Sequence, residues 1–430
     1  MPYDEDPKQS PKEGSGHEEE EPFSFLQETI KPKPLSREKI LSQLARIAIY
    51  GLLFGIFACL GFFALKPWVE KQFQGDPKTV TIPEDEEEKE GEETSGEVEA
   101  TETEQPLSAG SYAQIMESMY ETSSEAYKGV VSVRAVTDTE DWESTATGIQ
   151  TSVTGLIVAD NGQELLILSD DSICSEAQGW TVIFADGNQY HAGLKKRDKN
   201  RGLAVFGVAR EGIASTTWSA IEVAELGNSN LVQQGDVVIA LGNTFGYADG
   251  TGYGIISSNA YQEVFSDGEC RVLATDISAA KGGTGILFNQ EGQAIGLISP
   301  DIWEEEESTT ANAYAISDLK SVIELLVNGE SVPYIGIFGT TVTDDISQQQ
   351  GMPDGVYVVQ VDADSPAMTA GIQSGDVIQS VGGTEVVTTS AYEQAVRKCR
   401  AGEPVKIRGS RLGADGYVDI EFDVTIGSWE

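Results

Sequence analysis

Hydrophobic positions divide the 430-residue chain into one long apolar run and a later series of short ones. The long run, Ile47 to Leu65, reads "IAIYGLLFGIFACLGFFAL" and contains no charged residue. At about 1.5 Å of rise per helical residue, its length nearly matches the ~30 Å hydrocarbon core of a bilayer. A buried globular helix usually keeps a polar face, and this run has none. We therefore predict a transmembrane helix over residues 44–66.

The residues before this run favour a retained anchor over a cleaved secretory signal. The preceding segment is more than forty residues long and holds the acidic cluster "GHEEEEP", unlike the short basic start of a signal peptide. Basic residues crowd the flank of the run, at Lys31, Lys33, Arg37, Lys39 and Arg46. By the positive-inside rule, we expect residues 1–43 to be a disordered cytoplasmic tail. The chain would then cross the cell membrane once, with its C-terminal domains extracytoplasmic.

Acidic residues outnumber basic residues by 70 to 28, which gives a net charge of −42. Such a chain repels phosphate backbones, so we expect no nucleic-acid partner. Much of the acidity lies in residues 83–106, where low hydrophobicity and like-charge repulsion prevent a core from forming. Their spacing lacks the alternating oxygen ligands and turn glycine of a calcium loop. We predict an acidic disordered linker over residues 67–108.

Residues 109–330 have the pattern of a β-rich domain. A segment with apolar residues at helical intervals, "SYAQIMESMYETSSEAY", predicts a helix from Ser111 to Tyr127. Short apolar segments such as "ELLILS", "LAVFGVA" and "GDVVIALG" then recur at close spacing, with Gly, Asp and Asn between them. This pattern favours a mainly β barrel or sandwich over a parallel βαβ sheet.

Four stretches in this region resemble successive blocks of the HtrA/Deg family of serine proteases. They are "SVTGLIVADNGQELLILSDDSI", "FADGNQYHAGLKKRDKNRGLAVFGV", "QQGDVVIALGNTFG" and "TDISAAKGGTGILFNQEGQAIGLIS". The third contains "LGNTFG", similar to a Gly-Asn-Pro-Phe-Gly turn of the family, with Thr244 in place of the proline. The resemblance implies a trypsin-like double β-barrel over residues 109–330. It also implies a PDZ domain after the barrels and, for some members, trimers formed near the barrel's N-terminus.

The resemblance also implies a catalytic triad, in which a histidine takes the proton of a hydroxyl nucleophile and a carboxylate orients the histidine. In the family the histidine lies in a Thr-Asn-Asn-His stretch, and the matching "SDDS" places Ser172 at that position. The carboxylate precedes a Leu-Ala-Val strand, and "GLAVFGV" places Gly202 there. Both the base and the group that orients it are therefore missing.

The nucleophile of the family lies in Gly-Asn-Ser-Gly-Gly-Pro. The stretch "GGTGIL" aligns best with Thr284 at the serine, and a one-residue gap leaves Gly283 as the alternative. The serine is absent in both alignments, so we expect no intact catalytic triad. Gly282 and Gly283 are expected to keep an oxyanion-like nest of N–H groups that binds a peptide carbonyl.

Two other residues are alternative bases. Lys281 lies three residues before Thr284, but a lysine acts as a base only when burial lowers its pKa, and the loop "SAAKGG" shows no sign of burial. His191 lies in "GNQYHAGLKKRD", which matches an outer strand of the family. We interpret it as an exposed or hydrogen-bonded strand histidine.

The last hundred residues resemble a bacterial PDZ domain, which we place at residues 334–428. The resemblance is carried by "GVYVVQVDADSPAMTAGIQSGDVIQSVGGTEV", by the helical "TSAYEQAVRKC" and by two further strands. In such domains a peptide adds a strand to the sheet edge, and N–H groups of a short loop capture its terminal carboxylate. The stretch "YIGI", Tyr334 to Ile337, fits that loop, so we predict peptide binding at Tyr334, Ile335, Gly336 and Ile337. An ordinary strand with one glycine is the alternative.

Cysteine and histidine usage gives no sign of a metal or cofactor. Cys59 lies in the predicted membrane helix, which leaves Cys174, Cys270 and Cys399 for at most one bridge outside it. Cys174 and Cys270 are the candidate pair, because both lie in the predicted barrel domain, but spacing leaves the bridge open. Neither His17 nor His191 has a second ligand at zinc spacing. We expect no cofactor.

These observations lead to the hypothesis of a membrane-anchored HtrA-like pseudoprotease that binds protein or peptide C-termini and unfolded segments through its PDZ domain. Envelope protein quality control or a scaffold role would fit such a protein, either as a homo-trimer or as a hetero-oligomer with an active protease. The alternative is an endopeptidase of the same family that uses Thr284 as its nucleophile.

Overall fold

The computed structural model describes residues 77–85, 109–136, 152–175, 177–303 and 308–430, together with Tyr50 and Leu52. Apart from these two positions, the described residues belong to one compact unit, Asp76–Glu430. The predicted cytoplasmic tail, nearly all of the predicted transmembrane helix and most of the acidic linker lie outside the described residues. Among the helices that are described, none combines the length and the apolar character that a bilayer crossing requires.

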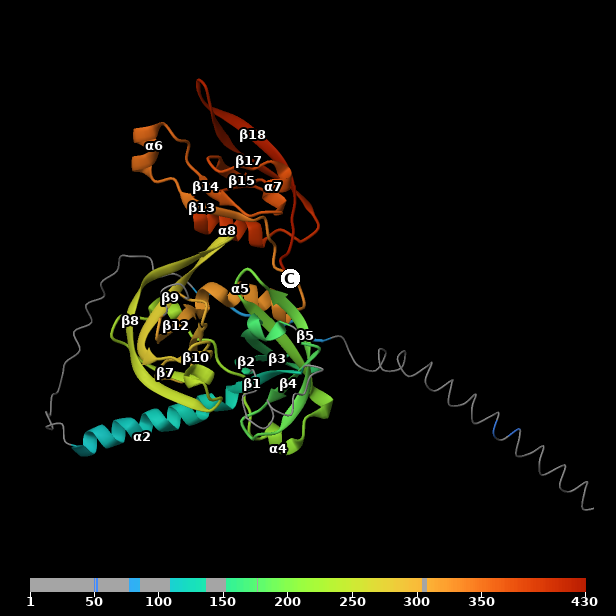
Figure 1. Ribbon diagram of the computed structural model, residues 1–430, viewed down its shortest axis with the longest axis vertical. Helices are drawn as coiled ribbons and strands as arrows, with labels where there is room; N and C mark the ends of the chain where they lie inside the picture. The colour runs from blue at the N-terminus through green and yellow to red at the C-terminus, as the bar shows by residue number, and fades with distance from the viewer. Residues whose placement is uncertain are drawn as a thin grey trace, which may run out of the picture. The chain divides into compact units, whose positions relative to one another are not determined.

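Six antiparallel strands close the first barrel in the order β1-β2-β3-β6-β5-β4 (Figure 1). Asn161 and Gly162 set the tight β2–β3 turn, because the Asn161 side chain accepts the N–H groups of Gln163 and Glu164 and Gly162 adopts a φ of 89°. The strands are β1 (Val130–Val136), β2 (Ser152–Asp160), β3 (Glu164–Asp170), β4 (Gly179–Ile183), β5 (Gln189–Asp198) and β6 (Leu203–Ala209).

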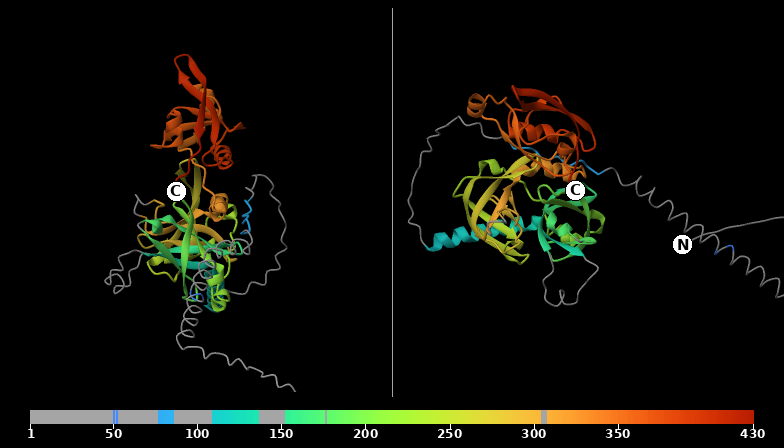
Figure 2. Two further views of the ribbon diagram at one scale, coloured as in Figure 1. Left: turned by 90° about the vertical axis from the view of Figure 1, so that its right-hand side faces the viewer. Right: turned by 45° about the horizontal axis from the view of Figure 1, so that its top comes forward.

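Six further strands close the second barrel in the order β10-β11-β12-β9-β8-β7. Its bounds are β7 (Val237–Gly242), β8 (Gly250–Phe265), β9 (Gly268–Ser278), β10 (Gly285–Phe288), β11 (Ala294–Ile298) and β12 (Thr310–Ala315), followed by helix α5 (Ile316–Val327). Strands β8 and β9 form a long hairpin, and Figures 1 and 2 show its far end reaching the C-terminal domain. The two closed barrels confirm the mainly β fold predicted from the sequence.

Residues 77–85 form an extended segment that lies against α5. The N–H of Val80 donates to the side-chain oxygen of Asn328, and the Val80 carbonyl accepts a bond from the same amide group. Ile82 is buried in the main hydrophobic core, and Val80 packs against that core. The disorder predicted for residues 67–108 therefore does not hold for this stretch, because two apolar side chains precede the acidic run and find a place in the core.

Helix α2 (Ala109–Ala126) confirms the helix predicted from the residues before the first barrel. It is followed by η1 (Tyr127–Gly129), and Ser123 near its end lies 3.0 Å, oxygen to oxygen, from the hydroxyl of Tyr253 on β8. Three large side chains of the helix are exposed, at Tyr112, Ile115 and Tyr120. The trimer suggested by the family resemblance stays a prediction.

The C-terminal domain is built on the sheet path β13-β14-β15-β17-β18, with β16 paired to β15. Its strands are β13 (Ile337–Thr341), β14 (Val356–Val361), β15 (Val377–Val381), β16 (Thr384–Glu385), β17 (Pro404–Gly413) and β18 (Gly416–Thr425). Its helices are α6 (Asp344–Gln350), α7 (Pro366–Ala370) and α8 (Thr389–Arg397). Strand β13 lies at the edge of the sheet, which leaves one side of it open to another strand.

Candidate functional site

Ser172, the predicted position of the catalytic base, lies in the one-turn helix η2 (Asp171–Cys174) directly after β3. Asp170 caps this turn, because its side chain accepts the N–H of Ser172 at 3.0 Å. The Ser172 side chain is exposed. The local backbone thus presents a side chain at the position predicted for a base, but that side chain is a hydroxyl.

Gly202, the predicted position of the orienting carboxylate, lies directly before β6 and next to η2. Its carbonyl accepts the N–H of Asp171 at 2.9 Å, so the structure places Gly202 beside the residue that precedes Ser172. Gly202 has a φ of 66°, and a Cβ built on it would lie 3.5 Å from a carboxylate oxygen of Asp301 and 3.9 Å from one of Asp171. A carboxylate at this position would therefore face two others.

Asp171 is paired with Arg197 of β5, whose Nε lies 2.7 Å from the carboxylate. Burial raises the pKa of Asp171, and the hydrogen bond and charge of Arg197 oppose that shift. A second carboxylate, Asp170, accepts a bond from the hydroxyl of Ser299 at 3.2 Å. The sequence reasoning did not single out these polar residues, since an aspartate pair after a strand has no signal that separates it from a surface turn.

Thr284, the predicted nucleophile position, lies between the two barrels. Its hydroxyl oxygen accepts the N–H of Thr154 on β2 at 2.8 Å, and the Thr154 hydroxyl donates to the Thr284 carbonyl at 2.9 Å. The Thr284 hydroxyl itself points at the Thr154 hydroxyl, 3.4 Å away, and the residue is only 2 % exposed. We call the contact between Thr154 and Thr284 the inter-barrel seam. The hydroxyl of Thr284 is thus engaged in hydrogen bonds within this seam.

The glycines before Thr284 form a closed turn. The N–H of Gly283 donates to the carbonyl of Ala280 at 2.9 Å, and Gly282 has a φ of 73°. Of the two glycines predicted to form an oxyanion-like nest, Gly283 thus has its N–H bonded within the loop. A Cβ on Gly283 would lie 2.4 Å from the carbonyl oxygen of Thr244, so this position has no room for a side chain.

The two alternative bases lie where the sequence analysis placed them. His191 is on β5, opposite Thr181 of β4, and its side chain is exposed. The interpretation of an exposed strand histidine is confirmed. Lys281 is also exposed, on the loop before Gly282. An exposed ammonium group lacks the desolvation that a lysine base requires.

The loop Tyr334 to Ile337 leads into edge strand β13 and forms a nest of N–H donors. The N–H groups of Ile335 and Gly336 lie 2.6 and 2.7 Å from one carboxylate oxygen of Asp267, and that of Ile337 lies 3.0 Å from the other. Gly336 has a φ of 93°, and a Cβ there would lie 2.4 Å from the Cβ of Ser365, so the loop requires glycine. A loop of this form fits the capture of a carboxylate.

The carboxylate in this nest belongs to Asp267, at the tip of the β8–β9 hairpin of the second barrel. The hydroxyl of Tyr392 on α8 donates to it at 2.6 Å. Burial raises the pKa of Asp267, and its hydrogen bonds oppose that shift. The sequence analysis missed Asp267 as a site residue. A two-residue turn between long strands indicates a hairpin tip, but nothing local indicates where the tip binds.

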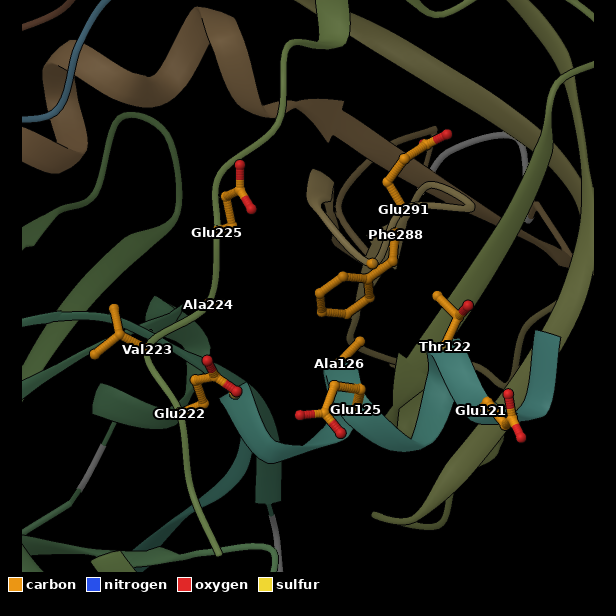
Figure 3. Close-up of a pocket in the computed structure, with 12 residues that line it drawn as sticks. Glu121, Thr122, Glu125, Ala126, Glu222, Val223, Ala224, Glu225, Phe288 and Glu291 are labelled. Carbon is orange, nitrogen blue, oxygen red and sulfur yellow. The ribbon is translucent and has the colours of Figure 1, made fainter. Parts of the chain in front are cut away.

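A separate hollow of about 500 Å³ lies beside the end of α2. Figure 3 shows glutamate side chains from separate segments around it, with the ring of Phe288 among them. Its acidic lining residues are Glu121, Glu125, Glu222, Glu225 and Glu291. Across the residues that the structure describes, no three potential ligands from among His, Cys, Asp and Glu are placed to hold a metal ion.

Comparisons with known proteins agree with the two parts of the fold. Residues 153–297 match the family model of the trypsin-like peptidase domain, and residues 333–422 match that of the PDZ domain. A "Probable periplasmic serine endoprotease DegP-like" of Rhizobium meliloti is 27% identical over 275 residues, 62% of this chain and 52% of the relative. The "Serine protease Do-like HtrA" of Lactobacillus helveticus is 25% identical over 293 residues, 63% of this chain and 68% of the relative.

The chain belongs to the HtrA/Deg family. Among solved structures, the serine endoprotease from Yersinia pestis matches this HtrA/Deg chain with a TM-score of 0.50 and 24% identity, over 76% of this chain and 100% of that one. The HtrA-type protease AlgW with decapeptide matches with a TM-score of 0.51 and 20% identity, over 73% of this chain and 99% of that one. These likenesses show the shared fold. The aligned region spans about half the length of the DegP-like relative from Rhizobium meliloti.

Proposed function

We propose that this HtrA/Deg chain is a pseudoprotease, which binds polypeptide ends and does not hydrolyse them. One observation carries the proposal: the positions that the family resemblance assigns to base, orienting carboxylate and nucleophile hold Ser172, Gly202 and Thr284. A serine cannot take the nucleophile's proton at neutral pH, and a glycine cannot orient a histidine. Because triad members act as a unit, the loss of even one removes several orders of magnitude in rate.

An endopeptidase that uses Thr284 is the second candidate, favoured by the names of relatives that are called serine endoproteases. It requires an accessible hydroxyl and a base. Two observations count against it: the Thr284 hydroxyl is bonded to Thr154 in the buried seam, and Lys281 is exposed. We therefore favour binding over hydrolysis.

The binding site of the proposal is the PDZ loop, with N–H donors at Ile335, Gly336 and Ile337. A peptide would lie along edge strand β13, and its terminal carboxylate would enter the loop. The partners would be protein or peptide C-termini and unfolded segments. The acidic balance of the chain argues against nucleic acid as a partner.

The proposed setting is the cell membrane. The uncharged run from Ile47 to Leu65 would anchor the chain, with the basic flank on the cytoplasmic side and the barrels and PDZ domain outside. A role in envelope protein quality control or as a scaffold follows from these parts together. Such a protein would work as a homo-trimer or in a hetero-oligomer with an active protease.

The full chain in detergent micelles tests the two candidates. It is incubated with an unfolded protein substrate and with a hydroxyl-reactive probe, beside a Thr284→Ala variant. The proposal predicts neither cleavage nor labelling in either sample. Cleavage by the natural chain that is lost in Thr284→Ala would establish the endopeptidase instead, whereas cleavage retained in both would point to a contaminating protease.

A further inference from the structure

The PDZ loop is occupied in this structure by a carboxylate of the same chain. Asp267 accepts four hydrogen bonds, from the N–H groups of Ile335, Gly336 and Ile337 and from the Tyr392 hydroxyl, at 2.6 to 3.0 Å. Asp267 is 4 % exposed. Hydrogen bonds to a charged acceptor are about twice as strong as neutral ones, so this is a strong contact between the barrel domain and the PDZ domain.

The backbone of Asp267 also behaves as an added strand would. Its N–H donates to the carbonyl of Ile337 at 2.8 Å, and Ile337 is the first residue of edge strand β13. Peptides bind PDZ domains by this kind of strand addition, with main-chain bonds to the edge and a carboxylate in the loop. Asp267 alone makes both kinds of contact: its backbone N–H bonds to the edge strand, and its side-chain carboxylate lies in the loop.

The groove between β13 and α8 is filled by the same hairpin. Residues from both strands of the hairpin, Phe265 and Gly268 among them, line it together with Thr389 and Tyr392 of α8. Only about 20 Å³ of free space remains there. A peptide backbone needs far more room than this, so the hairpin and a peptide exclude each other.

Further contacts hold the hairpin tip in the groove. Ser266 is fully buried, and its carbonyl accepts a bond from the side chain of Asn200 at 2.7 Å. Its hydroxyl donates to Asp362, which also accepts the hydroxyl of Tyr334 at 2.8 Å. Asp267 itself adopts a φ of 62°, a conformation that aspartate tolerates better than most residues.

We propose that Asp267 is an internal ligand of the PDZ loop, which holds the place of the terminal carboxylate of a peptide partner until that partner displaces the β8–β9 hairpin. The inference rests on the proposed function, since it takes the loop to be the binding site for peptide C-termini. Each of the three loop N–H groups carries one hydrogen, and all three are engaged by Asp267. The partner must therefore end in a free carboxylate and must bind more favourably than the hairpin does.

A self-occupied groove lowers the measured affinity for peptides by the fraction of molecules in which the groove is open. Asp267→Ala removes the internal carboxylate and leaves the three N–H donors in place. Asp415→Ala is the control, because it removes an exposed carboxylate from the PDZ domain, at the turn between β17 and β18, away from the loop. Tyr392→Phe is a milder variant, which removes one hydrogen bond to Asp267 and keeps the ring that lines the groove.

The experiment measures binding of the full chain to dye-labelled peptide pools with randomised final residues, which end in a free carboxylate or in an amide. We expect Asp267→Ala to bind the carboxylate pool about 10-fold more tightly than the natural chain, Tyr392→Phe to show a smaller gain, and Asp415→Ala to show none. No variant should bind the amide pool. Equal affinity of the natural chain, Asp267→Ala and Tyr392→Phe would overturn the internal ligand and leave the proposed peptide binding intact.

Amide hydrogen exchange separates the two proposals if no variant binds any peptide, a result that would overturn peptide binding. The N–H groups of residues 335–337 should exchange slowly in the natural chain and faster in Asp267→Ala and Tyr392→Phe. Unchanged exchange in both variants would overturn the internal ligand. If Asp267→Ala does not fold, Tyr392→Phe decides the question in both measurements.

Discussion

The hydroxyl oxygen of Thr284 lies 2.8 Å from the backbone nitrogen of Thr154 and accepts its hydrogen bond. The two residues come from different barrels, Thr154 from β2 and Thr284 from the loop before β10. The hydroxyl at the position predicted for a nucleophile is thus a structural group that joins the barrels. This hydrogen bond stabilises the folded protein, because a buried backbone N–H without an acceptor lowers the free energy of unfolding.

Thr284→Val tests this structural role, since valine keeps the shape of the side chain and removes its oxygen. The Thr154 N–H would lose its acceptor in a buried position, which we expect to lower the free energy of unfolding by about 1–3 kcal/mol. Denaturant unfolding of the full chain measures the change. Thr384→Val, at an exposed position of β16, is the control and should change stability by less than about 0.5 kcal/mol. An equally small effect at Thr284 would argue against a structural hydroxyl.

Restoring the triad residues should not restore a protease. In the triple variant Ser172→His, Gly202→Asp, Gly283→Ser, the new aspartate faces the carboxylates of Asp171 and Asp301. The new serine has its Cβ 2.4 Å from the Thr244 carbonyl oxygen if nothing moves. We expect no cleavage of an unfolded protein above that of the natural chain.

Two further variants accompany this test. One carries Thr284→Ser in place of Gly283→Ser, to cover the other alignment of the nucleophile. The second keeps the natural Ser172 and carries only the other two substitutions, so that it lacks the histidine base. Cleavage by a rebuilt triad that is lost when Ser172 is kept would contradict the prediction. It would show that the inter-barrel seam accommodates an active nucleophile more readily than its contacts indicate.

Lys320 of α5 and Asp85 form a buried ion pair that ties residues 77–85 to the barrels. The ammonium group lies 2.7 Å from the carboxylate, and the lysine side chain is 5 % exposed. Asp85→Ala leaves this cation without its partner, so we expect a loss of about 3–5 kcal/mol in the free energy of unfolding. The exposed neighbour Glu84 provides the control, Glu84→Ala.

A compensating variant sharpens this prediction. Lys320→Met combined with Asp85→Ala removes both charges, and most of the lost stability should return because no unpaired charge remains buried. A double variant as unstable as Asp85→Ala would mean that the pair contributes through packing or through the Ser317 hydroxyl, which also donates to Asp85 at 2.6 Å.

The three cysteines that the structure describes are free thiols, so the candidate bridge between Cys174 and Cys270 is not formed. Burial raises the pKa of Cys174 to about 11 and holds that of Cys270 well above its usual range. The thiolate is the reactive form, and a higher pKa lowers its fraction at any pH below it. Alkylation of native Cys174 should therefore keep rising with pH through 9 without a plateau, while Cys270 should react only after unfolding. Mass spectrometry of the labelled chain measures both, and a plateau near pH 9 for Cys174 would contradict the effect of burial.

The sequence was sufficient for the fold because strand patterns and turn residues act locally. Alternating apolar segments and the "YIGI" loop lie within short stretches, and their resemblance to a family fixes the order of the parts. The glycine of that loop is recognisable because only its backbone freedom suits the nest, as the φ of 93° at Gly336 shows.

The occupant of the loop could not be predicted in the same way. Asp267 and Ile335 are 68 residues apart, and the pairing depends on how the hairpin of one domain meets the loop of another. The same large separation in sequence applies to Asp85 and Lys320, which are 235 residues apart. In both cases an acidic residue in a polar stretch is most simply interpreted as solvated, and only the tertiary structure assigns it a partner.

Gly268→Ala tests the docking of the hairpin without changing Asp267. A Cβ on Gly268 would lie 2.5 Å from a carboxylate oxygen of Glu393 and 2.9 Å from a guanidinium nitrogen of Arg201. These two side chains are buried and paired with each other at 3.3 Å, so neither can move away without breaking an ion pair. We expect the hairpin tip to leave the groove and the amides of residues 335–337 to exchange about 10-fold faster.

Gly193→Ala is the matched control for this last variant. Gly193 also lies in a strand, β5, but a Cβ there meets no atom within 4 Å. Amide exchange at residues 335–337 should be the same in Gly193→Ala as in the natural chain. If Gly268→Ala also leaves it unchanged while the variant stays folded, the Arg201–Glu393 pair yields to the added methyl group, and the tip is held more loosely than its contacts indicate.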